Sequence, residues 1–353
     1  MTALVNRWRA KFEELQGITL ALFLVALCLP LFDAALPREF KIADLMRPIF
    51  IFAILGLGLN IVTGYTGLLN LGVAAFMAIG AYSYSILSCD IYPFQLGFWG
   101  AVVCATFSGA ISGVVLGLPT IRLQGDYLAI VTLGFGEIIQ DSLKNLDSIT
   151  KGTQGINPLP YPTFFGYAFT AQEYLPWYYL FLAILVLVAV ISYNLEHSRV
   201  GRAWISIRED ELASGCMGIQ PVKNKLLAFS VGAALCSLAG ALWASYLGSS
   251  GEPGNYDFQV SVIALCIVIV GGMGNISGVL IGALLMVGFN SIFLVKLSDF
   301  LMREGMVSTT NVFSSPNNWK YMVFGLALIL TMRFRPLGVL PAGQPRKRQA
   351  ATR

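Results

Sequence analysis

The sequence predicts an all-α polytopic membrane protein with about ten transmembrane helices. Of its 353 residues, 56% are hydrophobic and only 12% are charged, whereas soluble domains average about 25% charged residues. The mean hydropathy is +0.71. A soluble fold could not bury this much apolar surface, so lipid must cover part of it. The apolar residues also gather in long runs, and the charged residues stand between these runs.

Ten apolar runs are candidates for spanning helices, which need roughly 20 residues, with a range of about 17–25. Basic residues precede the first run, but no clear cleavage site follows it, so we expect a helix and not a signal peptide. Three runs (48–63, 259–271 and 319–333) are short, so their ends are uncertain or they are broken helices. In chain order the runs are 18–36, 48–63, 68–88, 98–118, 127–143, 176–193, 225–247, 259–271, 276–297 and 319–333.

Small residues recur at every fourth position in three of these runs. Examples are Gly109 and Gly113 in the fourth run and Gly232 and Gly240 in the seventh. Small residues at this spacing let helix backbones approach closely inside a membrane. The stripes therefore predict a tightly packed helix bundle.

The basic residues predict the orientation of the chain. With ten spans, the amino terminus, the loop 194–225 and the carboxyl tail lie on one side, and this side holds most of the 23 basic residues. Basic loops stay in the cytoplasm. We therefore expect a cytoplasmic segment at 1–17, a transmembrane domain at 18–333 whose loop 194–225 is cytoplasmic, and a basic cytoplasmic tail at 334–353.

Several classes of function are excluded by what the sequence lacks. The basic residues form no single patch, so we expect no nucleic acid partner. The six cysteines form no CxxC pair and His197 is the only histidine, so we expect no metal site. The chain has no GxxxxGK[ST] phosphate loop, so it cannot itself be an ATPase. We expect no catalytic residues and no cofactor in this chain.

A densely charged segment lies between two uncharged apolar runs. It spans 197–219 and reads HSRVGRAWISIREDELASGCMGI. Ser206 and Glu209 have the spacing of a capping box, and Gly215 or Gly218 offers a stop. The pattern predicts a short amphipathic helix at 207–217 that a partner outside the membrane binds. An ordinary cytoplasmic loop is the alternative.

Two segments, 57–72 and 265–282, share a pattern. Each has a short apolar run, then a glycine-rich break with an asparagine (Asn70 and Asn275), then a new apolar run. Paired glycine-interrupted segments in the two halves of a transporter point to its substrate pathway. Non-helical backbone at membrane depth is tolerated only inside protein or along a water-filled cavity. We therefore place both asparagines near a pathway.

Glu137 lies ten residues into the fifth run, about 15 Å from its start at 1.5 Å per residue. An ionised carboxylate at this depth is costly unless it is paired or hydrated. We expect a buried side chain. It either lines a polar pathway, where it could meet an ammonium group, or is a structural acid that bonds to a neighbouring helix.

The loop 144–175 is the longest connection on the side opposite the charged segment. Lys151 offers a charge there, and Gly152 and Gly155 allow a tight turn with close approach. We expect a contact surface for a soluble partner, with a passive loop as the alternative. Segment 298–318 is a second candidate on the same side.

Four motifs together resemble one known family. They are GYTGLLNLGVAAFMAIGAY at 64–82, GDYLAIVTLGFGEII at 125–139, SITKGTQGI at 148–156 and the charged segment 197–219. Their order and content are similar to those of branched-chain amino-acid ABC importer permeases of the LivM type. One departure is Thr153-Gln154, where relatives often show Pro-Asn, and it leaves open which amino acid is carried.

The resemblance implies an ABC importer permease bundle in the bacterial inner membrane. Its implied partners are a related second permease, two cytoplasmic ATPase subunits that use the ATP, and a periplasmic amino-acid-binding protein. It implies that the charged segment is the coupling helix that enters a cleft on the ATPase. The residues expected to couple to the ATPase are Arg208, Glu209, Asp210, Glu211 and Gly218.

Three rival functions remain open at this point. An ABC permease for urea or short amides is the nearest in mechanism. An ion-coupled secondary transporter belongs to a different class, and it would favour several buried carboxylates. A solute channel would need no coupling helix.

Overall fold

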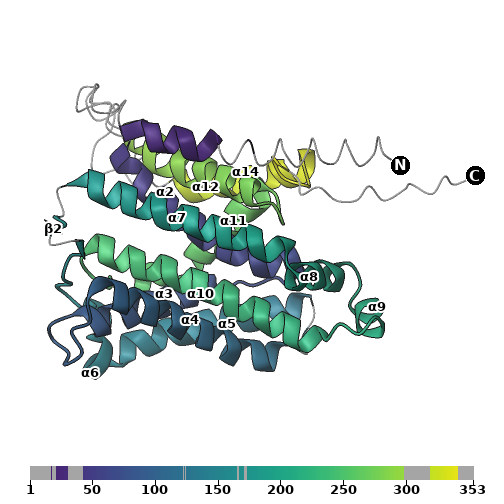
Figure 1. Cartoon of the computed structure of the whole chain (residues 1–353), viewed down its shortest axis with the longest axis horizontal. Helices are drawn as coiled ribbons and strands as arrows, with labels where there is room; N and C mark the ends of the chain where they lie inside the picture. Colours follow the sequence, from purple (N-terminus) through teal and green to yellow (C-terminus); the bar gives the residue numbers. More distant parts are fainter. Residues whose placement is uncertain are drawn as a thin grey trace, which may run out of the picture.

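The computed structural model describes residues 17, 21–30, 43–121, 123, 125–164, 167–170, 173–297 and 319–340. The predicted amino-terminal segment up to residue 16, the candidate surface 298–318 and the tail beyond residue 340 lie outside the described residues. The described chain is a bundle of helices that run roughly side by side (Figure 1).

The bundle consists of long helices joined by short ones. The long helices are α2 (Ala43–Leu59), continued by the π-helix η2 (Asn60–Tyr65), α3 (Val73–Ser88), α4 (Phe98–Thr120), α5 (Asp126–Asn145), α7 (Tyr174–His197), α10 (Pro221–Leu247), α11 (Phe258–Gly271), α12 (Ile276–Gly288), continued by η5 (Phe289–Leu294), and α14 (Lys320–Phe334). The short elements are α6 (Asp147–Thr150), η3 (Gly152–Gln154), α8 (Arg199–Glu209), α9 (Glu211–Cys216), η4 (Pro253–Tyr256) and one antiparallel pair of two-residue strands, β1 (Thr163–Phe164) and β2 (Tyr167–Ala168).

The predicted helical class is confirmed, whereas the count of about ten spans is not. Within the described ranges, six helices are long and apolar enough to cross a membrane: Leu45–Tyr65, Phe98–Thr120, Tyr174–His197, Pro221–Leu247, Pro253–Gly271 and Ile276–Leu297. Three more apolar helices are shorter, at Ala21–Pro30, Val73–Ser88 and Met322–Phe334. The remaining predicted run, 127–143, became α5, whose 20 residues include four charged ones. Composition marked all ten runs as helices, but the described parts of four of them are too short or too polar to span by that measure alone.

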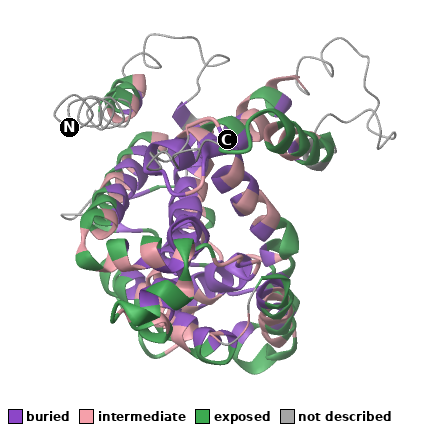
Figure 2. Cartoon of the chain, turned by 90° about the vertical axis from the view of Figure 1, so that its right-hand side faces the viewer, coloured by how far each residue is buried: buried purple, intermediate pink, exposed green. Residues whose placement is uncertain are grey.

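Helix α10 packs against α2, α3 and α4 at the centre of the bundle. A Cβ atom added at Gly240 of α10 would lie 1.9 Å from the Met77 carbonyl oxygen of α3, and one at Gly109 of α4 would lie 2.2 Å from the Ser237 side chain. The stripes of small residues therefore lie where helix backbones touch, as predicted. Figure 2 shows the buried residues inside the bundle and the exposed ones around it.

The two long connections lie at opposite ends of the bundle. In Figure 1, α8 and α9 lie at the right-hand end, whereas α6 and β2 lie at the left-hand end. Helix α7, of 24 residues, runs between these two ends. A partner of the segment 197–219 and a partner of the loop 144–175 would therefore bind opposite ends of the protein.

Candidate functional site

The charged segment forms two helices instead of the one predicted. Ser198 caps α8 by accepting a hydrogen bond from the Gly201 amide at 3.2 Å. Asp210 has an extended backbone, ends α8, and caps α9 by accepting a 3.0 Å hydrogen bond from the Ala213 amide. Aspartate competes in this way for backbone donors, so it favours a cap over a helix interior. The predicted start of the helix 207–217 is therefore wrong, because α8 ends at Glu209 and α9 begins at Glu211.

Ser206, the predicted cap, lies inside α8. Its hydroxyl lies 2.7 Å from that of Ser214 in α9, so it fixes the angle between the two short helices. The predicted stop is confirmed at Gly218, whose φ of +84° is accessible mainly to glycine. We refer to α8, α9 and the turn that follows, residues 199–218, as the coupling element, after the role that the sequence analysis predicts for this segment.

The tip of the coupling element exposes two large apolar side chains. Leu212 and Met217 are each 83% exposed. Three of the five predicted coupling residues, Glu209, Asp210 and Gly218, are exposed beside them. Apolar side chains with a polar rim are typical of protein contact surfaces.

The other two predicted coupling residues point into the protein. The Arg208 guanidinium donates a hydrogen bond to the Gly64 carbonyl oxygen at the end of η2. Glu211 forms a 2.7 Å ion pair with Lys225, whose side chain is only 3% exposed. These two residues attach the coupling element to the bundle, and their contact with an ATPase stays a prediction.

Aromatic stacking completes this attachment. The rings of Tyr65 and Trp204 are nearly parallel, with centroids 6.4 Å apart. The Trp204 indole donates to the Asn224 carbonyl oxygen at 2.8 Å, and the Tyr65 hydroxyl donates to Glu196 at 3.1 Å. Trp204 and Ile207 are three residues apart on the buried face of α8. Apolar residues at this spacing are typical of an amphipathic helix, and they are the signal in the sequence that could have predicted this attachment of α8 to the bundle.

The two glycine-interrupted segments are in contact, although more than 200 residues separate them. The Asn60 side-chain oxygen accepts a 2.8 Å hydrogen bond from the Gly274 amide. A Cβ atom at Gly64 would lie 2.7 Å from the same amide nitrogen. Sequence analysis paired the segments by pattern, but it did not single out Asn60, which joins them.

Asn70 stabilises the turn just before α3, and Asn275 caps α12. The Asn70 side chain accepts a 2.9 Å hydrogen bond from the Gly72 amide just before α3. The Asn275 side chain caps α12 through the Ser277 amide at 3.0 Å and donates to the Leu340 carbonyl oxygen. Both side chains are buried and satisfy backbone groups at helix starts. Their place near a pathway stays a prediction.

The expectation that the Glu137 side chain is buried is wrong, because it is exposed in this chain. No hydrogen bond or ion pair joins its carboxylate to another residue in the described ranges. It shares one face of α5 with Tyr127, Ile130 and Ile138, which are also exposed, and with Gly134, where an added Cβ atom would meet nothing within 4 Å. We refer to this surface as the open face of α5. The sequence predicts only how far along its helix Glu137 lies, and the rotation of α5 decides which way its side chain points.

The open face of α5 differs from the other exposed helix faces. On α4 the large exposed side chains are Trp99, Val103, Phe107, Ile111, Val115 and Leu118, an apolar row suited to lipid. Among the long helices in the described ranges, only α5 combines exposed apolar residues with a carboxylate and a glycine within one turn of each other. Such a face suits water or another protein better than lipid.

The turn in the loop 144–175 has the predicted backbone. Lys151, Gly152 and Gly155 have φ angles of +61°, +57° and +67°. Lys151 is exposed, whereas both glycines are buried. Of the three residues predicted to contact a binding protein, only Lys151 is therefore accessible, and the glycines shape the turn that presents it.

This turn is joined to the loop after α10. The Ile156 amide donates to the Ser250 hydroxyl at 2.8 Å, and the Ser250 amide donates to the Ile156 carbonyl oxygen at 3.1 Å. The Leu159 amide bonds to the Gly248 carbonyl oxygen. The two loops therefore form one continuous surface at this end of the bundle.

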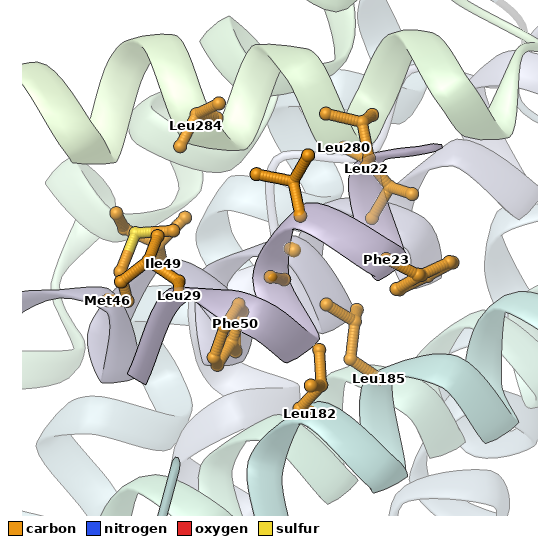
Figure 3. Close-up of a pocket in the computed structure, with 13 residues that line it drawn as sticks. Leu22, Phe23, Leu29, Met46, Ile49, Phe50, Leu182, Leu185, Leu280 and Leu284 are labelled. Atoms are coloured by element: carbon orange, nitrogen blue, oxygen red, sulfur yellow. The ribbon is translucent and has the colours of Figure 1, made fainter. Parts of the chain in front are cut away.

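An apolar cavity of about 90 Å³ lies between the segment Ala21–Pro30 and helices α2, α7 and α12 (Figure 3). Leucine, phenylalanine, isoleucine, methionine, valine and alanine side chains line it, among them Phe23, Phe50 and Leu182. These offer no polar partner for an ammonium or carboxylate group. Over the described part of the chain, no group of three His, Cys, Asp or Glu residues could hold a metal ion.

A helical bundle in which two glycine-interrupted segments are in contact is typical of membrane transport proteins. Residues 41–332 match the family described as the permease component of the branched-chain amino acid transport system. The chain belongs to this family, so it is a transport permease and not an enzyme.

Three relatives illustrate the family. The chain is 38% identical over 323 residues to the high-affinity branched-chain amino acid permease LivM of Escherichia coli K12, covering 86% of this chain and 70% of LivM. It is 26% identical over 254 residues to the permease LivH of the same strain, covering 67% and 79%. It is 27% identical over 277 residues to the ribose import permease RbsC of Haemophilus influenzae, covering 74% and 79%. No solved structure matches the chain.

Proposed function

We propose that the chain is the membrane subunit of an ATP-driven importer of branched-chain or other hydrophobic amino acids. The observation that carries the proposal is the coupling element, anchored to the bundle by Arg208 and Glu211 and exposing Leu212 and Met217. A chain that lacks a phosphate loop has to receive the work of ATP hydrolysis through such a surface. The identity to LivM over most of the chain supports the choice of substrate.

The proposed partners follow from two surfaces, at the two ends of the bundle, and from the similarity to two permeases. Two cytoplasmic ATPases provide the energy, and one of them binds the tip of the coupling element. A periplasmic amino-acid-binding protein docks on the surface that Lys151 and the loop after α10 present at the opposite end. A related second permease completes the membrane part, which is supported by similarity to both LivM and LivH. This arrangement lies in the bacterial inner membrane with both termini in the cytoplasm.

The substrate pathway is proposed to run along the open face of α5. Its mixture of Glu137, Gly134 and apolar side chains fits an amino acid that has an ammonium group and an apolar side chain. In this chain the face is uncovered, so the second permease would form the opposite wall. Asn70, in the turn before α3, and Asn275, the cap of α12, would support the pathway by positioning these two helices.

Uptake by the reconstituted complex tests the proposal. The chain, its partner permease and the two ATPases are placed in vesicles with the binding protein outside, and uptake of radiolabelled leucine is measured. We expect uptake that needs both ATP and the binding protein. Uptake of urea but not leucine would identify an amide permease, and uptake driven by an ion gradient without ATP would identify a secondary transporter.

A further inference from the structure

The non-helical segment Gly67–Gly72 connects two parts of the proposed machinery. It follows η2 and leads into α3. At its start it touches the coupling element, and at its end it touches α5. Neither contact was expected from sequence, which assigned Arg208 to the ATPase and Thr132 to no role.

Arg208 holds the first end of this segment. Its guanidinium donates to the Gly64 carbonyl oxygen, and a Cβ atom at Gly67 would lie only 3.0 Å from Cγ of Arg208. The charged end and the aliphatic stem of one side chain therefore both rest on the break in the helix. Gly67 has a φ of +73°, a conformation that favours glycine and leaves room for the stem.

Thr132 holds the other end. Its hydroxyl accepts a 3.0 Å hydrogen bond from the Leu71 amide and donates to the Ala129 carbonyl oxygen of its own helix. A Cβ atom at Gly72 would lie 2.6 Å from the Thr132 carbonyl oxygen, so the segment touches the α5 backbone. Thr132 is fully buried, five residues before Glu137 on the other side of α5.

We propose that Gly67–Gly72 is a strap that transmits movement of the coupling element to α5, with Arg208 and Thr132 as the positioning residues at its two ends. This rests on the proposed function, in which ATPase closure moves the coupling element and α5 lines the pathway. Arg208 bonds to the backbone of η2 three residues before the strap while its stem packs on Gly67, and Thr132 bonds to the strap backbone at Leu71. Such bonds carry displacement better than apolar contact alone, because hydrogen bonds are directional. The strap gives the coupling energy a continuous physical route.

Hydrogen exchange on the complete importer tests the first end. Exchange is compared with and without a non-hydrolysable ATP analogue in peptides from the coupling element, the strap and α5. In the wild type we expect all three to respond. In Arg208→Met, which keeps the stem but removes the donor, the coupling element should respond while the strap and α5 do not. Arg208→Lys, which keeps a donor, should restore the response.

Thr132→Val tests the second end. The strap should respond as in the wild type, whereas α5 should not, and Thr132→Ser should restore the response. Thr106→Val is the matched control, since that hydroxyl bonds only within α4, to the Val102 carbonyl oxygen. For Arg208→Met and Thr132→Val, leucine uptake per ATP hydrolysed should fall about two- to thirtyfold, the range for residues along a coupling route.

Two results would overturn the strap. One is a normal strap or α5 response in Arg208→Met and Thr132→Val. The other is loss of the coupling element's own response in Arg208→Met. That loss would mean that Arg208 contacts the ATPase, as the sequence predicts. A wild-type complex in which no peptide responds and no leucine enters would instead overturn the proposed function, and the strap with it.

Discussion

At the scale of single residues, Glu137 decides what the open face of α5 does. Glu137→Gln keeps the shape of the side chain and removes the charge. If the carboxylate meets the ammonium group of the substrate, the loss of a charge-assisted hydrogen bond worth about 1.5–3 kcal/mol should lower leucine uptake roughly ten- to hundredfold. Assembly should be unaffected, because the side chain is exposed in this chain.

Asp141→Asn is the matched control for Glu137→Gln. Asp141 is also an exposed carboxylate on α5, but it forms a 3.4 Å pair with Lys144 on the same helix. Such exposed pairs contribute about 0–1 kcal/mol, so uptake should hardly change. Full leucine uptake by Glu137→Gln, together with a smaller amount of folded protein for Glu137→Leu, would show that Glu137 has a structural role and does not contact the substrate.

Gly240 tests how tightly the bundle packs. Gly240→Ala places a methyl group against the Met77 carbonyl oxygen, where no flexible side chain can move away. Overpacking of this kind costs about 1–3 kcal/mol, so the variant should unfold at a lower temperature in detergent. Gly100→Ala lies in α4 with only the Leu96 side chain within 4 Å, at 3.9 Å, and should leave the unfolding temperature unchanged or raise it. Equal effects of the two substitutions would contradict the packing argument.

At the scale of elements, the exposed tip of α9 should have a different role from the residues that attach α9 to the bundle. Leu212→Ser with Met217→Ser removes both exposed apolar side chains and leaves the Glu211–Lys225 pair intact. The permease should still reach the membrane, because neither side chain packs in the bundle. Stimulation of ATP hydrolysis by the loaded binding protein should fall at least about tenfold, as for the central residues of a protein interface. Unchanged stimulation would place the ATPase contact elsewhere.

The Glu211–Lys225 pair should behave in the opposite way. Glu211→Ala leaves the Lys225 charge buried without its partner, which costs about 3–5 kcal/mol in buried pairs and somewhat less here because Glu211 is partly exposed. The amount of folded permease should drop. Glu211→Leu combined with Lys225→Met removes both charges and should recover most of the folded protein, as measured by size-exclusion chromatography. Failure of the double substitution to recover it would mean that the pair does more than neutralise charge.

At the scale of the whole molecule, the two ends of the bundle should face opposite sides of the membrane. Cys216 is exposed at the coupling element, and Thr153 is exposed in the turn at the other end. Native Cys216, and a Thr153→Cys substitution made in a chain lacking Cys216, should react with a membrane-impermeant maleimide from different sides. Ser214 would be a poor probe, because it is buried. Reaction of both from one side would overturn the predicted orientation.

Sequence by itself determined what depends on local composition. The apolar runs became helices because any helix in lipid must satisfy its own backbone and expose apolar side chains. Gly109 and Gly240 marked helix contacts because only small residues let backbones meet. The positive φ at Gly218 and the turn at Lys151–Gly155 followed from glycine's backbone freedom.

Only the tertiary structure decided the relations between elements. Which way Glu137 points depends on the rotation of α5, and the Asn60–Gly274 bond joins segments that share a pattern but no neighbouring sequence. Asp210 and not Ser206 caps the second short helix, and the Ser206 hydroxyl bonds to that of Ser214 across the two helices. Arg208 pointed inward because a carbonyl at the end of η2 lay within its reach. Long polar side chains choose among partners that only the assembled fold brings near, which a single sequence does not encode locally.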